Sequence, residues 1–93
     1  MQNDVRLEKI RVAIEAALHP VRLEIVDQSH RHAGHAGARD GRGHFDVLIV
    51  SDTFNGKLPL ARHRMVFAVV GDLMETDIHA LSIKALSTDE MSS

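Results

Sequence analysis

The chain has no cysteine and very few aromatic residues, and each absence excludes a class of function. Its 93 residues include three phenylalanines but no tryptophan and no tyrosine. Without thiolates, the chain cannot hold an iron–sulfur cluster through cysteines of its own or form a disulfide scaffold. Because single-strand nucleic-acid binders stack bases on aromatic rings, so few rings argue against that mode of binding.

Long apolar runs and an excess of positive charge are missing as well. No apolar stretch approaches the roughly 20 residues that span a bilayer, and the polar start MQNDVRLEKI does not have the form of a signal or transit peptide. The formal net charge of −2 does not indicate a general nucleic-acid binder, whose affinity comes mainly from contacts with phosphates. Together with the lack of cysteine, these features predict a cytoplasmic protein with no membrane partner.

Histidine is the residue type that the chain has in excess. There are seven, and four of them fall between positions 30 and 44, namely His30, His32, His35 and His44. A fifth, His79, stands alone in an apolar segment near the end of the chain. Imidazole is the commonest metal ligand in proteins, and it changes charge near neutral pH. These histidines are therefore the first candidates for a metal site.

The hydrophobic pattern predicts two helices and three strands in a single domain that covers residues 1–93. Apolar residues recur at helical spacing in two segments and alternate with polar residues in three. The helices are expected over 3–18 and 61–75, the strands over 21–28, 44–51 and 78–86, a histidine- and glycine-rich loop over 29–43, and a frayed tail over 87–93. The order helix, strand, strand, helix, strand indicates an α+β fold of two layers, with both helices on one face of a three-stranded mixed sheet.

The last strand contains His79, and side chains alternate between the two faces of a strand. His79 is therefore expected to share a face with Leu81 and Ile83, while Ile78 and Ala80 face the other way. Spacing alone favours a plain role for His79, as a strand-end histidine hydrogen-bonded to a backbone carbonyl.

The loop histidines also have plain interpretations. Their side chains could simply be solvated. Alternatively, the H-x-H-x-x-H pattern of residues 30–35 could chelate zinc or nickel adventitiously, since imidazole suits both ions. His44 precedes a strand, and we expect it to hydrogen-bond locally rather than to bind a metal.

Four sequence segments in this order resemble the BolA family: VDQSHRH, HFDVLIVSDTFNGK, ARHRMV and IHALSIKA. The resemblance covers nearly the whole chain. It implies a KH-like fold of the type II topology, in agreement with the order of elements predicted above. One feature of nucleic-acid-binding KH domains is missing, because the segment FNGKLPL has only Gly56 where a Gly-x-x-Gly backbone clamp would stand.

The resemblance implies partnership with a monothiol glutaredoxin. The two proteins would share a bridging [2Fe–2S] cluster, with a glutaredoxin cysteine and glutathione supplying the thiolates, and the isolated chain would hold no cofactor. By the family pattern His79 is the strand ligand. The pattern D-x-S-x-x-[H/C] falls on Asp27, Ser29 and His32, and His35 is close enough to be the loop ligand instead. Alone, the chain is expected to be a monomer or a weak homodimer.

A short basic run, Lys57, Arg62, His63 and Arg64, surrounds the predicted start of the second helix. A solvated helix face is the usual meaning of such a cluster. Because BolA proteins are also described as transcriptional regulators, it could instead contact DNA phosphates, or it could dock glutathione or an acidic face of a partner. The rival hypothesis is therefore a DNA-binding regulator of stress response and cell morphology that uses the KH-like face.

The sequence contains no recognisable motif of an enzyme active site. It has no phosphate-binding loop and no dinucleotide fingerprint. Ser51 and Asp52 could belong to a partial triad, but nothing marks a strained nucleophile or an oxyanion hole. The sequence therefore predicts a protein that is not an enzyme.

Overall fold

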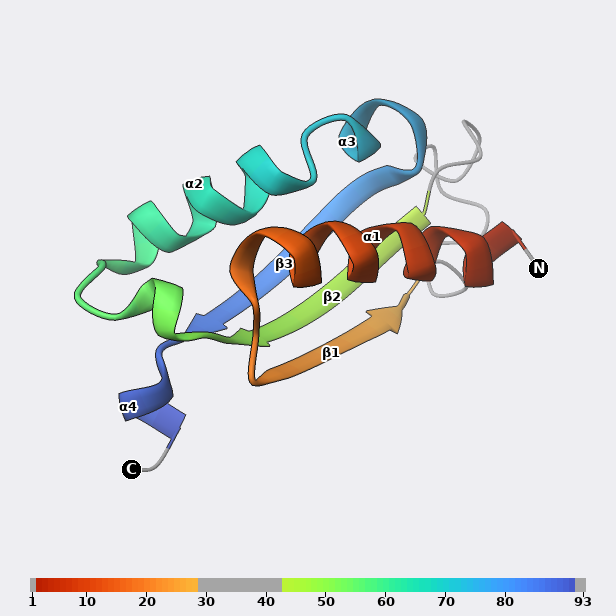
Figure 1. Cartoon of the computed structure of the whole chain (residues 1–93). Helices are drawn as coiled ribbons and strands as arrows, with labels where there is room; N and C mark the ends of the chain where they lie inside the picture. Colours follow the sequence, from red (N-terminus) through yellow and green to blue (C-terminus); the bar gives the residue numbers. More distant parts are fainter. Residues whose placement is uncertain (1, 29–42, 92–93) are drawn as a thin grey trace.

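The structure is a computed structural model that describes residues 2–28 and 43–91. It confirms the predicted α+β fold with a three-stranded mixed sheet (Figure 1). The elements are α1 (Gln2–Leu18), β1 (Arg22–Asp27), β2 (Gly43–Val50), a short 3-10 helix η3 (Asp52–Phe54), α2 (Pro59–Val69), α3 (Leu73–Thr76), β3 (Ile78–Leu86) and α4 (Thr88–Met91).

The sheet has the strand order β1-β2-β3, so β2 is its central strand. β1 pairs with β2 antiparallel, whereas β3 pairs with β2 parallel. Parallel neighbours cannot be joined by a tight turn, and here α2 and α3 carry the chain back across the sheet (Figure 1). Because α1 and α2 lie over the same face and contact each other, the molecule has two layers.

The core lies between the helices and the covered face of the sheet. Every second side chain of β2 points into it, and the apolar stripes of α1 and α2 meet them there. Its fully enclosed apolar members are Ile10, Ile14, Leu18, Phe45, Val47, Ile49, Phe54, Val66, Val70 and Ile78. The apolar residues of the second predicted helix lie at this core, with Val66 and Val70 buried and Met65, Val69 and Leu73 packed against it.

The end of α1 is tied to the end of β2 by two hydroxyl groups. Ser51 Oγ and Thr53 Oγ1 both donate hydrogen bonds to the carbonyl oxygen of Leu18, over 2.5 and 3.1 Å. The last carbonyls of a helix have no partner within the helix, so these bonds satisfy one of them. His19 then turns the chain with a positive φ of 47°, and Pro20 prevents further helix.

Three predictions about individual elements are wrong. The single helix expected over 61–75 is instead α2 and α3, separated at Gly71, where an added Cβ would lie 3.3 Å from the carbonyl oxygen of Phe67. α2 also begins earlier, because Pro59 has the backbone angle of a first helical residue and needs no donor there. The tail expected to be frayed contains α4, which side-chain contacts described below hold in place.

Replacing Ile14 by alanine should destabilise the fold, because Ile14 is fully buried on the core-facing side of α1. We expect the free energy of unfolding to fall by about 3 kcal/mol, the usual cost of a large-to-small change in a core. The matched control is Val12→Ala, two residues away on the same helix, where the side chain is 52% exposed. That change should alter stability by no more than about 0.5 kcal/mol. Urea unfolding of both variants measures the difference, and equal losses would contradict the described packing of α1.

Candidate histidine site

His79 lies in a β-bulge at the start of β3. Gly43 of β2 pairs with Ile78, and the next residue, His44, pairs with Ala80, so His79 is the additional residue between them. Ile78 is fully buried and His79 is exposed. The predicted alternation is therefore wrong at this point, because the bulge breaks it. His79 does not share the core-facing side of Leu81 and Ile83, and it is presented to solvent at one end of the sheet.

The bulge brings His79 beside His44, the second residue of β2. The centres of the two imidazole rings are 5.0 Å apart, and the ring planes are inclined by 47°. His44 is half-buried, and sequence reasoning gave it no part in the site. No local signal could have revealed the pair, because it depends on the parallel register of two strands separated by more than 30 positions. Among the residues described here, no three histidine or acidic side chains converge on a common point where a metal ion could be held.

Asp77 holds the start of β3 in position from several sides. Its carboxylate lies 3.2 Å from Lys9 Nζ and 3.8 Å from Arg6 Nε, both on α1. Its backbone carbonyl accepts a 2.9 Å hydrogen bond from the Gly43 N–H, and its own N–H donates to Leu73 over 2.7 Å. Asp77 is 8% exposed, so its side chain is largely shielded from water. The backbone that presents His79 is therefore well fixed.

The histidine-rich segment enters and leaves the sheet at this same place. The Gln28 N–H, the last that the structure describes before that segment, donates a 2.7 Å hydrogen bond to the carbonyl oxygen of His44. Asp27, at the end of β1, pairs with Phe45. Ser29 and the candidate ligands His30, His32 and His35 lie outside the described residues.

Arg62 does not belong to an exposed basic patch, and this prediction is wrong. Its side chain is buried, with 7% of the residue exposed. Its Nε donates to the carbonyl oxygen of Lys57 over 2.8 Å, and its Nη1 donates to Ala85 over 3.0 Å and to Glu90 over 2.6 Å. These bonds join the turn before α2, the end of β3 and α4, so the guanidinium is not available to a phosphate.

The sequence did contain a signal for this burial. Arg62 precedes Val66 by four residues and Val70 by eight, which puts it on the buried stripe of the helix. Lys57 and Arg64 are exposed as expected, and His63 is half-buried. None of these three side chains forms an ion pair with the part of the chain that the structure describes.

Glu90 is the carboxylate that completes the Arg62 network. The hydrogen bond from Arg62, and after it that from the Ser87 N–H, lower the pKa of Glu90 from 4.5 to about 2. The same carboxylate oxygen accepts both bonds, the one from Ser87 over 2.8 Å. Thr88 adds a hydrogen bond to Asp52. These contacts explain why α4 forms where the sequence predicted a frayed tail.

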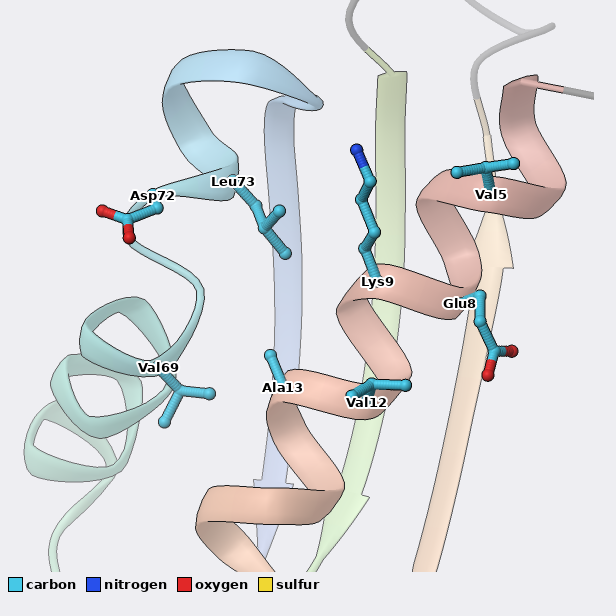
Figure 2. Close-up of a pocket in the computed structure, with 8 residues that line it drawn as sticks. All are labelled: Val5, Glu8, Lys9, Val12, Ala13, Val69, Asp72 and Leu73. Atoms are coloured by element: carbon cyan, nitrogen blue, oxygen red, sulfur yellow. The ribbon is translucent and has the colours of Figure 1, made fainter.

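A groove lies elsewhere, between α1 and the pair α2 and α3 (Figure 2). It has a volume of about 710 Å³. Figure 2 shows Val69 and Leu73 pointing toward Ala13 across this space. Its lining is Val5, Glu8, Lys9, Val12, Ala13, Val69, Asp72 and Leu73. None of the predicted site residues lines it.

The fold and the histidine pair define a small α+β protein that presents an imidazole at a strand bulge. The model of the BolA family, described as BolA-like protein, matches residues 14–90, so this chain belongs to the BolA family. It is 40% identical over 83 residues to the Escherichia coli (strain K12) protein named DNA-binding transcriptional regulator BolA, covering 89% of this chain and 76% of that protein.

Plant proteins are similar as well. The chain is 43% identical over 88 residues to SufE-like protein 1, chloroplastic/mitochondrial, of Arabidopsis thaliana, covering 89% of this chain and only 24% of that longer protein. The solved BolA domain of SufE1 from the same plant superposes with a TM-score of 0.79 at 41% identity, covering 89% of this chain and 92% of that domain. The likeness therefore concerns the BolA domain.

Replacing either of the two arginines of α2 by leucine should affect stability, but to unequal extents. Arg62→Leu leaves the carbonyl oxygens of Lys57 and Ala85 without their donor, and we expect the free energy of unfolding to fall by about 2 kcal/mol. Arg64→Leu, two residues further on at an exposed position, should change it by less than about 0.5 kcal/mol. Urea unfolding compares them, and a greater loss for Arg64→Leu would refute the burial of Arg62.

Acid should loosen α4 before it unfolds the sheet. The folded state binds the ionised form of Glu90, so its contribution is present above about pH 4.5 and is lost as the pH falls toward 2. Amide NMR signals of residues 87–91 should therefore shift over this range in the wild type. In Glu90→Gln the same amide signals should not shift over this pH range. An identical pH course in both proteins would contradict the Arg62–Glu90 contact.

Proposed function

We propose that this BolA-family protein is an adaptor that binds a monothiol glutaredoxin and helps to ligate a [2Fe–2S] cluster bridging the two proteins. Its role would be in iron–sulfur cluster trafficking or iron regulation. The observation that carries the proposal is the exposed His79 in its bulge beside His44, where the chain also enters and leaves the histidine-rich segment. One relative is named a SufE-like protein, which supports a connection with iron–sulfur clusters.

The donor chemistry suits this role. His79 would supply one imidazole nitrogen and a loop histidine, His32 or His35, the second, while the glutaredoxin cysteine and glutathione supply thiolates. Two imidazoles on one iron occur in Rieske centres, where they raise the potential of the cluster. Because a histidine must be deprotonated to bind a metal, such a site is also sensitive to acid. Both properties suit transfer or sensing better than permanent storage.

The neighbours of His79 would serve the site by fixing its geometry. The ring of His44, 5.0 Å away, limits the orientations open to His79. The contacts of Asp77 with Lys9 and Gly43 fix the backbone two residues earlier. A ligand held in one orientation loses less conformational freedom when the cluster-bearing partner binds.

The remaining aspects of this function rest on family membership. BolA relatives are named as a regulator or as BolA-like proteins rather than as enzymes. We therefore propose that the present chain is not an enzyme. Within the described part of the chain, no helix combines the length and apolarity needed to cross a membrane. Cytoplasmic location stays a prediction, since the Arabidopsis relatives are named chloroplastic or chloroplastic/mitochondrial. The monomer or weak homodimer expected of the isolated chain also stays a prediction.

DNA binding is the second candidate, favoured by the name of the Escherichia coli relative. Its proposed contacts are reduced to Lys57, Arg64 and the half-buried His63, because Arg62 is engaged within the protein. Three contacts on a chain of net charge −2 would give weak and strongly salt-dependent binding. A mobility shift that persists at about 150 mM salt and disappears in Lys57→Glu/Arg64→Glu would establish this function.

The cluster proposal predicts that His79→Ala abolishes the mixed complex. Anaerobic reconstitution with a monothiol glutaredoxin and glutathione, followed by size exclusion, should give a coloured heterodimer with the wild type. Its visible circular dichroism should differ from that of the glutaredoxin homodimer. His79→Ala should lose this spectrum because one ligand is removed, whereas the control His63→Ala, on α2, should retain it.

An unchanged spectrum in His79→Ala, or a heterodimer whose spectrum equals that of the glutaredoxin alone, would overturn the proposal. If His79 proves necessary, His32→Ala and His35→Ala assign the second ligand. The variant that reproduces the His79→Ala spectrum identifies the ligand, and the other should resemble the wild type.

A further inference from the structure

The outer stripe of α2 exposes large apolar side chains. Leu58, immediately before the helix, is 77% exposed, Leu60 is 62% exposed and Phe67 is 40% exposed. Leu60, Arg64 and Phe67 are spaced four and three residues apart, so they lie along one side of the helix. This side is distinct from the buried stripe that contains Arg62. We call Lys57, Leu58, Leu60, Arg64 and Phe67 the α2 patch.

The α2 patch is positively charged. Lys57 and Arg64 are both exposed, and neither forms an ion pair with residues 2–28 or 43–91. Two acidic side chains in the region of Arg62 already have other partners. Glu90 accepts a hydrogen bond from Arg62, and Asp52 accepts one from Thr88. The patch therefore combines apolar area with two available cations.

Small side chains flank the stripe. Ala61 and Ala68 are exposed on α2 beside Leu60 and Phe67. Helices pack by setting the ridges of one into the grooves of the other, and short side chains allow a close approach. The shape of the surface thus suits an element of regular, helical form.

We propose that the α2 patch is a second docking surface, which binds an amphipathic helix of a partner protein that carries acidic residues beside its apolar face. The leucines and the phenylalanine would be covered by the apolar face, and Lys57 and Arg64 would pair with its carboxylates. DNA fits less well, because phosphates offer nothing to cover three exposed apolar side chains. A surface of two or three helical turns is small, so the complex is weak and transient.

The position of the patch gives this inference its functional meaning. Arg62 bonds the start of α2 to Ala85 near the end of β3, whereas His79 lies at the beginning of that strand (Figure 1). Ala85 lies six positions after His79, so the start of α2 is about 20 Å from the histidine site. A partner on the α2 patch therefore leaves the histidine site accessible, and the protein would join two other proteins.

The test uses the full chain and a labelled synthetic peptide of about 18 residues, five helical turns, built from leucine and glutamate at amphipathic spacing. A second peptide with lysine in place of glutamate and a mixed-sequence DNA duplex serve as alternative probes. Fluorescence anisotropy should detect binding of the acidic peptide only. Arg64→Glu and Leu60→Ser/Phe67→Ser should each weaken it about tenfold.

The matched control is Val5→Ser/Val12→Ser. These valines are 55% and 52% exposed on α1, and they line the groove between α1 and the pair α2 and α3 rather than the α2 patch. This double variant should bind the acidic peptide like the wild type. The proposal is overturned if the control weakens binding as much as the α2 variants. It is also overturned if both peptides bind equally, or if the duplex binds and the acidic peptide does not.

A second readout separates this inference from the proposed cluster function. The α2 variants should still form the coloured glutaredoxin complex, and His79→Ala should still bind the acidic peptide. If Leu60→Ser/Phe67→Ser instead loses the glutaredoxin complex, the patch belongs to the glutaredoxin interface and the inference fails. Both proposals predict that the glutaredoxin complex is lost in His79→Ala and retained in the α2 variants.

Discussion

The parallel pairing of β2 with β3 is the constraint on which the rest of the structure depends. Parallel strands need a long crossover, and α2 with α3 supplies it over the face that α1 also covers. The pairing directs β3 away from the bulge at His79 and toward α2. It thereby places the bulge at His79 and the start of α2 at opposite ends of one strand.

Each end of β3 is held by an ionic junction that involves a buried charge. At its start, Asp77 accepts from Lys9 and joins β2 through the Gly43 N–H. Near its end, Arg62 donates to Ala85 and Glu90. Buried charged groups are costly unless their hydrogen bonds are satisfied, so these junctions specify where the strand begins and ends. Their effect on function is indirect, since they position exposed side chains nearby.

Periodicity in the sequence was sufficient for the fold class and for the core positions of both long helices. It failed where contacts between distant segments decide the outcome. The bulge arises from the register of β3 against β2, and no local pattern marks His79 as the additional residue. α4 depends on Arg62, which lies 28 residues before Glu90 in the chain. Glycine is unfavourable inside a helix, but the break between α2 and α3 at Gly71 depends on tertiary packing.

The candidate site was only partly predictable for the same reason. His79 was singled out through the family resemblance, and its exposure is a property of the bulge. His44 was not predicted to belong to the site because its contact with His79 joins two different strands. The run of basic residues predicted an exposed Arg62, whereas its spacing of four residues from the buried Val66 places it on the buried side of α2.

The proposed function requires the cluster-bearing partner to bind at the bulge end of the sheet. The most direct measurement is an amide NMR spectrum of the isotope-labelled full chain in complex with unlabelled, cluster-loaded glutaredoxin. The paramagnetic cluster should broaden the signals around His44 and His79 and leave those around Leu60 and Phe67 sharp. Broadening centred on α2, with sharp signals at the start of β3, would contradict the account.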